Sequence, residues 1–324
     1  MKIVITGATG YIGARLSKYL ADKGHEIVAV CYSSITDVDQ WAEKFQKIIR
    51  GDIREQKIIY QIANENADAV IHLVSLDHFA SEKDLHLVSQ INVLPTWNLL
   101  RECTKAGLKK FIFFSTVNVY GNLGNATLVN EDHPVKTGNT YGLTHYLSEN
   151  ICNHYNRNSN THVISARLSN SYGAPIFPEN NCWWLVINDL CKSAYQNKRI
   201  KLLSDGSPQR DFIHGNDLCK AVELLLNTDD KNNENSIYHV SSGKTYTILE
   251  LAGKIKSIFN DRYSENIPIS TSKEHEVIDF NIFSRNQRYT IDNSKLRDIG
   301  FEPLWDLDKG VNELFDYMEN LYGT

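Results

Sequence analysis

Three glycines near the N-terminus constrain the fold of this chain more than any other feature. Gly7, Gly10 and Gly13 follow a G-x-x-G-x-x-G spacing, just after a strand predicted at residues 2–5, of which 3–5 are apolar. Glycine permits a tight turn, a close approach of backbone to pyrophosphate and close packing of a helix on a strand. Residues 11–23 then carry apolar side chains at helical spacing, so a helix N-terminus with free N–H groups follows the turn. The pattern predicts a dinucleotide phosphate site.

The end of the second predicted strand, residues 26–31, bears on which nicotinamide cofactor binds. An acid there would bind the adenosine ribose and repel a 2′-phosphate. Cys31-Tyr32-Ser33-Ser34 offers neither an acid nor a base, so the choice between NAD(H) and NADP(H) stays open. Asp52 could meet the adenine edge or cap a loop. The cofactor contacts predicted up to this point are Gly7, Thr9, Gly10, Tyr11, Ile12, Gly13, Ser33, Asp52, Ile53 and Leu73.

Short apolar runs alternate with amphipathic segments through the first half of the chain. Strands are predicted at 2–5, 26–31, 69–74, 110–115 and 162–168, and helices at 11–23, 88–106 and 141–155. This alternation predicts an α/β fold, a Rossmann-type doubly wound parallel sheet with helices on both faces. The less regular second half predicts helices at 181–196, 217–226 and 248–259 and a strand at 236–240.

Two domains are expected from this outline. Residues 1–171 with about 207–243 would form the dinucleotide-binding Rossmann domain. Residues of about 172–206 and 244–324 would form a smaller C-terminal substrate-binding domain.

Composition excludes several classes of protein. The formal net charge of −5 gives no sign of a basic nucleic-acid-binding face or of a polybasic membrane-binding segment. No apolar run reaches the roughly 18 residues of a membrane span, and the N-terminus lacks a signal-peptide pattern, so a cytoplasmic protein is expected. The six cysteines form no Cys-x-x-Cys pair, so no metal site is predicted.

Five motifs occur in a fixed order, and together they identify a family. They occupy residues 6–13, 115–121, 141–145, 167–173 and 205–217. In this order the chain resembles extended short-chain dehydrogenases/reductases of the NAD-dependent epimerase/dehydratase group, which modify nucleotide-sugars. The resemblance covers nearly the whole chain. It implies a homodimer built from the helices at 88–106 and 141–155.

The resemblance also implies catalytic residues. Thr116 corresponds to the hydroxyl that binds the reacting sugar, and Tyr141 to the group that exchanges its proton during hydride transfer. His145 stands where the family has Lys, four residues after Tyr141 on the same helix face. A His can bind the nicotinamide ribose, but it lacks the fixed positive charge that lowers the Tyr pKa. We therefore expect the pKa of Tyr141 to stay nearer its reference of about 10 than a neighbouring Lys would leave it. Slow chemistry, another base or lost activity remain alternatives.

The residues after Thr116 narrow the reaction. Sugar 4,6-dehydratases carry Asp-Glu here, where this chain has Val117-Asn118, and C3/C5 epimerases carry Cys at the position of Asn118. Neither side chain can supply acid–base chemistry, so both reactions are disfavoured. Hydride transfer at one carbon, C4 in the resembling family, remains as 4-epimerisation, 4-ketoreduction or 4-dehydrogenation.

The substrate contacts implied by the resemblance lie in later motifs. Asn170 and Arg210 would contact the diphosphate of a nucleotide-diphosphate sugar, and Arg288 could add a second guanidinium or form a surface ion pair. The full predicted substrate set is Asp77, His78, Thr116, Asn118, Asn170, Arg210 and Arg288. Trp183 and Trp184, expected on a helix, could stack on the substrate or simply pack.

Two other functions compete with this one. A non-catalytic NAD(P)-binding sensor or regulatory protein would explain His145, although it would not need Thr116, Tyr141 and Arg210. An oxidoreductase acting on a steroid or phenolic aldehyde would not need Asn170 and Arg210.

Overall fold

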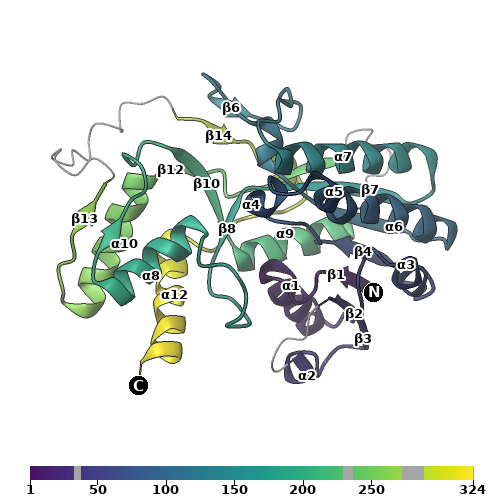
Figure 1. Cartoon of the computed structure of the whole chain (residues 1–324), viewed down its shortest axis with the longest axis horizontal. Coiled ribbons are helices and arrows are strands. Elements are labelled where there is room, and N and C mark those ends of the chain that lie inside the picture. The colour runs from purple at the N-terminus through teal and green to yellow at the C-terminus, as the bar shows by residue number, and fades with distance from the viewer. Residues whose placement is uncertain (33–37, 229–235, 272–287, 324) are drawn as a thin grey trace.

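Seven strands form one parallel sheet in the right-hand half of the molecule in Figure 1. This computed structural model describes residues 1–32, 38–228, 236–271 and 288–323, so Ser33 lies outside the described residues. The strands of the sheet, from one edge to the other, are β11 (Ile237–Val240), β7 (His162–Leu168), β5 (Lys110–Thr116), β4 (Ala69–His72), β1 (Lys2–Thr6), β2 (Glu26–Cys31) and β3 (Lys47–Arg50). This order confirms the predicted Rossmann-type doubly wound sheet.

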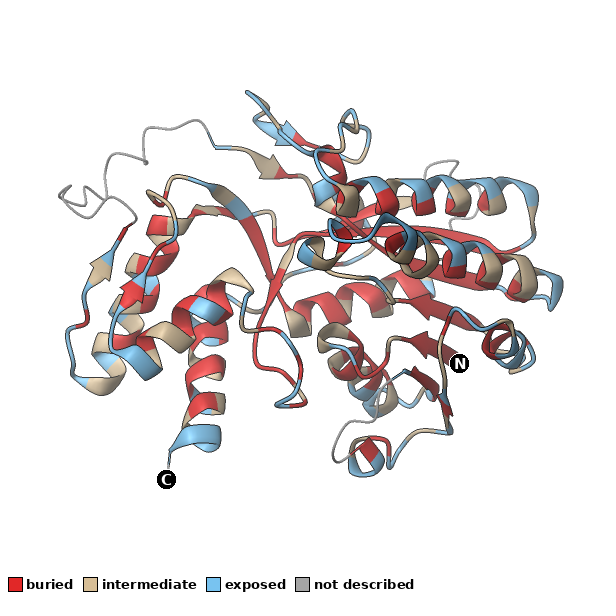
Figure 2. Cartoon of the chain, viewed as in Figure 1, coloured by how far each residue is buried: buried red, intermediate tan, exposed pale blue. Residues whose placement is uncertain are grey.

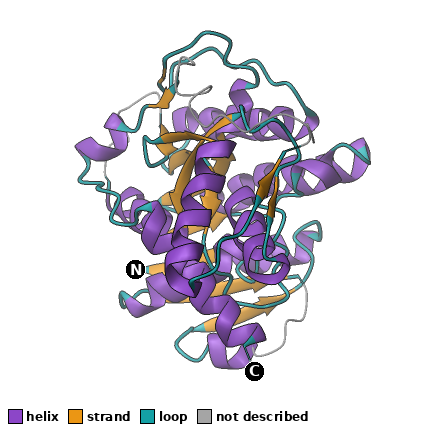
Figure 3. Ribbon diagram, turned by 90° about the vertical axis from the view of Figure 1, so that its left-hand side faces the viewer, coloured by secondary structure: helices purple, strands orange, loops and turns teal. Residues whose placement is uncertain are grey.

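Helices cover both faces of this sheet, as Figure 3 shows from the side. The helices are α1 (Tyr11–Asp22), α2 (Val38–Trp41), α3 (Gln56–Ala63), α4 (His78–Ser81), α5 (Leu85–Val88), α6 (Leu94–Lys105), α7 (Thr140–Asn158), α8 (Val186–Asn197), α9 (Gly215–Asn227), α10 (Ile248–Tyr263), α11 (Ser294–Asp298) and α12 (Leu307–Tyr322), with a π-helix at Ser89–Val93 and a 3₁₀ helix at Val117–Tyr120.

Alternation of side chains along the strands explains why both faces are covered. Ile3 and Ile5 pack with Leu16 of α1 on one face, whereas Val4 packs with Leu99 of α6 on the other. All of these residues are fully buried, and the strands of the large sheet are mostly red in Figure 2. Burial on two faces is why the strand sequences are nearly continuous apolar runs.

A second hydrophobic cluster lies away from the large sheet, around α8, α10 and α12 on the left of Figure 1. Three small sheets accompany it or link it to the first half. They pair β12 (Thr245–Thr247), β10 (Gln209–His214) and β8 (Asn170–Tyr172); β13 (Ile269–Ser270) and β9 (Ile200–Lys201); and β14 (Thr290–Ile291) and β6 (Leu128–Val129). The expected division at about 172–206 and 244–324 remains a proposal that this cluster supports.

Two sequence-based helix predictions need correction. The helix expected at 88–106 is interrupted by the π-helical residues 89–93, after which α6 begins at Leu94 with Pro95 in its first turn. The helix expected at 181–196 begins only at Val186. Trp183 and Trp184 therefore lie in the turn before α8, where the Trp184 indole Nε1 donates to the Asn181 carbonyl at 2.9 Å.

The strand order indicates at which edge of the sheet a ligand binds. β1 lies between β2 and β4, and the chain leaves β1 toward β2 on one side and later returns to β4 on the other. Open parallel sheets bind ligands outside the carboxyl ends of strands at such a reversal. Thr6, His72 and Thr116 end β1, β4 and β5 at that edge.

Candidate active site

The glycine turn has the geometry that the sequence predicted. Gly7 has a φ of +71°, which favours glycine, and a Cβ placed on Gly13 would lie 2.1 Å from the Gly7 carbonyl oxygen. Gly10 is the N-cap of α1 and has no side chain to satisfy the first N–H groups of the helix. These donors therefore remain for an anion such as a pyrophosphate.

Two of the other predicted cofactor residues, Thr9 and Tyr11, bond segments from the second half of the chain. The Tyr11 hydroxyl donates to the Gly173 carbonyl at 2.9 Å, and the Thr9 carbonyl accepts from the Asn180 amide at 2.9 Å. Ile12 is half-buried and Ile53 is buried. The structure thus ties the turn to segment 173–180, which the sequence did not indicate.

Two further cofactor candidates have local backbone or ionic partners. The Leu73 N–H donates to the Thr6 carbonyl at 3.3 Å, which continues the ladder beyond β4. The Asp52 carboxylate accepts from the Arg54 backbone and guanidinium, and the Arg54 hydrogen bond is the main cause of its lowered pKa. This is the loop-capping geometry considered for Asp52, and contact with adenine remains a prediction.

The structure brings Thr116 and Tyr141 together. Thr116 ends β5 and is buried, and its hydroxyl accepts the Asn118 N–H at 3.1 Å. Removal of the phenol from water raises the pKa of Tyr141 to about 12, the Thr116 hydrogen bond opposes the rise, and the Asp77 carboxylate adds to it. The pKa of Tyr141 is thus not lowered, as expected without the Lys charge, and it lies above its reference because burial disfavours the phenolate.

His145 lies one turn after Tyr141 in the buried face of α7. Its Nδ1 is 2.9 Å from the Tyr141 carbonyl oxygen, and burial lowers the pKa of His145 to about 4. A carbonyl oxygen can only accept, so Nδ1 carries the proton of the neutral ring and Nε2 keeps a lone pair. His145 in this state can accept a hydrogen bond from a ribose hydroxyl but supplies no positive charge.

A buried ion pair supports β5 and β7 behind the site. The Arg167 guanidinium on β7 bonds both carboxylate oxygens of Glu149 on α7, at 2.8 and 2.7 Å. Ser115, beside Thr116, also donates to Glu149. Both charged side chains are almost fully buried, and such a bidentate pair fixes geometry more than it adds stability.

The predicted diphosphate contacts line one cleft of about 460 Å³. Asn118, Asn170 and Arg210 all face it, and Tyr289 forms part of its wall. The Asn170 amide donates to the Asp211 carbonyl at 2.9 Å, whereas the exposed Arg210 guanidinium donates to the Gln209 carbonyl at 2.7 Å. The cleft therefore gathers residues from β8, β10 and the turn after β5.

Arg288 is exposed and forms an ion pair with Glu250. This is the surface ion pair that the sequence left as an alternative, and a phosphate-binding role of Arg288 remains a prediction.

Asp77 caps α4 by accepting from the Ala80 N–H at 2.8 Å. His78, the first residue of α4, contacts Phe79 with the ring centroids 3.9 Å apart and the ring planes tilted by 36°.

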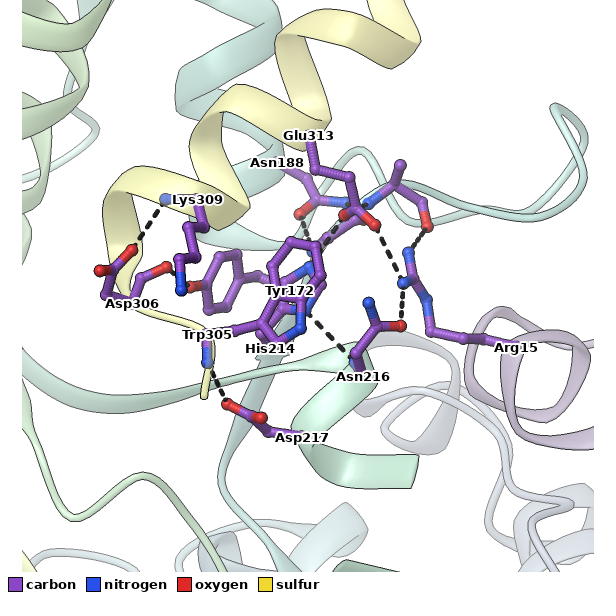
Figure 4. A network of polar contacts seen from close by, with 12 residues as sticks. Arg15, Tyr172, Asn188, His214, Asn216, Asp217, Trp305, Asp306, Lys309 and Glu313 are labelled. Carbon is purple, nitrogen blue, oxygen red and sulfur yellow. Dashed lines mark hydrogen bonds and ion pairs between the residues drawn. The ribbon is translucent and has the colours of Figure 1, made fainter. Parts of the chain in front are cut away.

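A polar network joins the phosphate-binding helix to the C-terminal helix (Figure 4). Arg15 on α1 donates to the Ala174 carbonyl at 2.6 Å and pairs with Glu313 on α12 at 3.0 Å. The Glu313 carboxylate also accepts from the Ala174 N–H at 2.9 Å and lies 2.8 Å from Nε2 of His214 on β10. Trp305 stacks on His214 at 4.0 Å. No local pattern in the sequence joins Arg15 to residues about 160 and 300 positions away, so this network was missed.

Comparison with known proteins identifies the family. The model of the NAD dependent epimerase/dehydratase family matches residues 3–241, which is more than half of the chain. This chain belongs to that family, as its motifs predicted, and is therefore a nicotinamide-dependent enzyme.

Individual relatives cover nearly the whole chain. A putative UDP-glucose 4-epimerase of Methanocaldococcus jannaschii is 27% identical over 320 residues, 98% of each chain. A dTDP-glucose 4,6-dehydratase of Streptomyces antibioticus is 27% identical over 98% of this chain and 92% of its own. The relatives thus modify nucleotide-sugars by different reactions.

The fold also matches a solved structure. UDP-glucuronic acid 4-epimerase from Bacillus cereus, in complex with UDP-glucuronic acid and NAD, superposes with a TM-score of 0.80 at 24% identity. The match covers 99% of this chain and 100% of that one.

Within the described residues, no helix combines the length and apolarity needed to span a membrane.

Proposed function

We propose that this enzyme binds a nicotinamide cofactor and a nucleoside-diphosphate sugar and transfers hydride at a single sugar carbon, C4. The observation that carries the proposal is the position of Thr116, at the carboxyl end of β5, close enough to the Tyr141 phenol to favour its phenolate. β5 lies next to β4 and two strands from β1, whose end bears the phosphate turn. The epimerase relatives and the structural neighbour that binds NAD support the same function.

Proton transfer is assigned to Tyr141. The bound nicotinamide supplies the hydride acceptor or donor. Loss of hydride from a carbinol carbon requires loss of the hydroxyl proton as well, and the Tyr141 phenolate would take it. Thr116 would hold the same hydroxyl, and its hydrogen bond already favours the phenolate. His145 would position the ribose as an acceptor.

Dehydration is disfavoured by the residues that follow Thr116. Val117 is apolar, and Asn118 has an exposed amide that cannot donate or accept a proton in catalysis. The dehydratase relatives share a family with this chain. Because its own residues do not suit dehydration, we assign it 4-epimerisation, 4-ketoreduction or 4-dehydrogenation.

The diphosphate is assigned to the cleft of Asn118, Asn170 and Arg210. The Arg210 guanidinium is exposed there, donates to the Gln209 carbonyl and lies beside Tyr289, whose pKa is raised by burial against the opposing effect of the Arg210 charge. A guanidinium suits phosphate oxygens through its two-pronged donor geometry.

The test is a single-turnover experiment. Purified enzyme loaded with NAD(H) or NADP(H) is mixed with a panel of nucleotide-sugars from pH 6 to 10 while cofactor absorbance is followed. Hydride transfer with at least one nucleotide-sugar is expected. A second candidate, the non-catalytic sensor, is favoured by the neutral His145 and the raised pKa of Tyr141. Because 4-epimerisation regenerates the cofactor, the sugar products are also analysed, and cofactor binding with neither an absorbance change nor an altered sugar at any pH would favour that second candidate.

We also propose a homodimer. Apolar side chains stand exposed along α6 and α7, among them Trp97, Leu143 and Leu147, the first of them 50% exposed. Leu143 and Leu147 share one helix face by their i, i+4 spacing. An apolar stripe of this kind is typical of a subunit interface.

A further inference from the structure

Three aromatic side chains form an exposed cluster between α4 and the turn before α8. The cluster consists of His78 and Phe79 on α4 and Trp184 in the turn before α8. Ring centroids are 5.3 Å apart for His78 and Trp184 and 6.0 Å for Phe79 and Trp184. Phe79 is 58% and Trp184 39% exposed, although large aromatic side chains are usually buried.

The aromatic cluster borders the catalytic tyrosine. Glu82, directly after α4, accepts the Thr140 N–H at 2.6 Å and the Thr140 hydroxyl at 2.8 Å. Thr140 directly precedes Tyr141. The charge of Asp77, the residue before His78, raises the pKa of the Tyr141 phenol. The turn that bears Trp184 follows Asn180, whose amide bonds Thr9 in the phosphate turn. Residues next to the cluster in sequence therefore contact both the start of the helix that bears Tyr141 and the phosphate turn.

Two carboxylates flank the aromatic cluster. Asp77 caps α4 through the Ala80 N–H, and Glu82 has a pKa lowered by its Thr140 hydrogen bonds, so Glu82 stays ionised. A substrate carboxylate held beside the cluster would therefore meet two like charges.

We propose that the aromatic cluster is a stacking wall for the sugar ring and that the site selects nucleotide-sugars whose sugar is uncharged, in preference to uronates. The inference rests on the proposed nucleotide-sugar function and adds the substrate class. Aromatic faces bury the apolar C–H face of a neutral pyranose, whereas Asp77 and Glu82 repel a C6 carboxylate. The Bacillus cereus neighbour, by contrast, is a UDP-glucuronic acid 4-epimerase.

The first experiment compares two substrates that differ only at C6. With UDP-glucose and UDP-glucuronic acid, single-turnover rate constants and half-saturating concentrations are measured at pH 8. The neutral sugar should be preferred by about tenfold or more in kcat/KM. Glu82→Gln should recover several-fold of the uronate reaction and leave the neutral sugar within about twofold. Equal or better use of the uronate by the unaltered enzyme would overturn the proposal.

The second experiment tests stacking. Trp184→Ala should raise the half-saturating concentration of UDP-glucose about tenfold and leave cofactor affinity unchanged. Tyr60→Ala removes an aromatic side chain of similar exposure on α3 and serves as the matched control. An unchanged half-saturating concentration in Trp184→Ala would refute the stacking wall. If the unaltered enzyme transfers no hydride with any nucleotide-sugar, the proposed function fails instead, which is a distinct outcome.

Discussion

The His145 imidazole Nδ1 lies 2.9 Å from the carbonyl oxygen of Tyr141, one helical turn earlier in α7. This contact fixes which ring nitrogen carries the proton, so Nε2 can only accept while the ring is neutral. With the pKa of His145 lowered to about 4 by burial, the ring has no charge at neutral pH. Tyr141 therefore lacks the nearby cation that would make it a stronger acid, and its pKa of about 12 reflects burial.

Tyr141→Phe should lower the hydride-transfer rate constant by about two to four orders of magnitude, the usual weight of a positioned acid–base group. The phenol hydroxyl is lost, and Thr116 alone cannot accept the proton at neutral pH. Stopped-flow absorbance of the cofactor measures the effect. Tyr146→Phe, on the same helix, is the matched control and should retain the rate. Full activity in Tyr141→Phe would show that another group is the base.

His145→Lys should move the pH–rate profile to lower pH. Oxidation of a sugar alcohol needs the phenolate, so the rate of the natural enzyme should rise with pH through 8 and 9 toward the raised pKa of Tyr141. An ammonium group one turn away would lower that pKa. His145→Gln keeps a polar side chain without charge and should leave the profile in place. Identical profiles for the Lys and Gln variants would mean that charge at this position does not control the base.

Gly13→Ala should abolish cofactor binding. The new methyl group would lie 2.1 Å from the Gly7 carbonyl oxygen, so the turn that offers its N–H groups to the pyrophosphate must open. Cofactor titration by calorimetry, with circular dichroism to confirm folding, measures this loss. Gly138→Ala is the control, because its added methyl has its nearest neighbour 3.9 Å away. Unchanged cofactor affinity in Gly13→Ala would place the dinucleotide elsewhere.

Glu313→Gln should lower the free energy of unfolding at neutral pH by about 1–3 kcal/mol, the usual cost of leaving a buried hydrogen-bonding group without its partner. Burial alone would raise the Glu313 pKa, but the His214 hydrogen bond and the Arg15 charge outweigh it and lower the pKa to about 2. A lowered carboxyl pKa stabilises the fold above the ordinary value of 4.5, and that contribution is lost as pH falls toward 2.

Urea unfolding across pH 2–8 checks the Glu313 prediction. The unaltered protein should lose stability between about pH 4.5 and 2, and part of that slope should be missing in Glu313→Gln. Glu26→Gln, at an exposed position, should keep the full slope. Equal slopes in all three proteins would show that Glu313 does not stabilise the network.

Light scattering at micromolar concentration should give a mass twice the 36.9 kDa of one chain. Leu147→Glu places a charge in the exposed apolar stripe of α7 and should produce monomers. Leu203→Glu, at a more exposed leucine outside the stripe, should leave the mass unchanged. A mass near 36.9 kDa for the unaltered protein would contradict the dimer.

Local patterns predicted the parts of the fold that depend on neighbouring residues. The glycine turn needs only its own backbone space, and the strands needed only continuous apolar runs, so both were evident in the sequence. The π-helix at residues 89–93 and the late start of α8 were not, because tertiary contacts decide them. Asn92 within that π-helix, for example, donates its side-chain amide to Thr144 of α7.

The sequence by itself determined the family, whose motifs are recognised by residue type and spacing, and through that resemblance it predicted the pairing of Thr116 with Tyr141. It also marked His145 as a departure. Only the tertiary structure decided how that departure acts: the sign of a pKa shift depends on burial and on charges from distant segments, here raising the Tyr141 pKa and keeping His145 neutral. The same holds for Arg15, His214 and Glu313, which meet only when α1, β10 and α12 pack together.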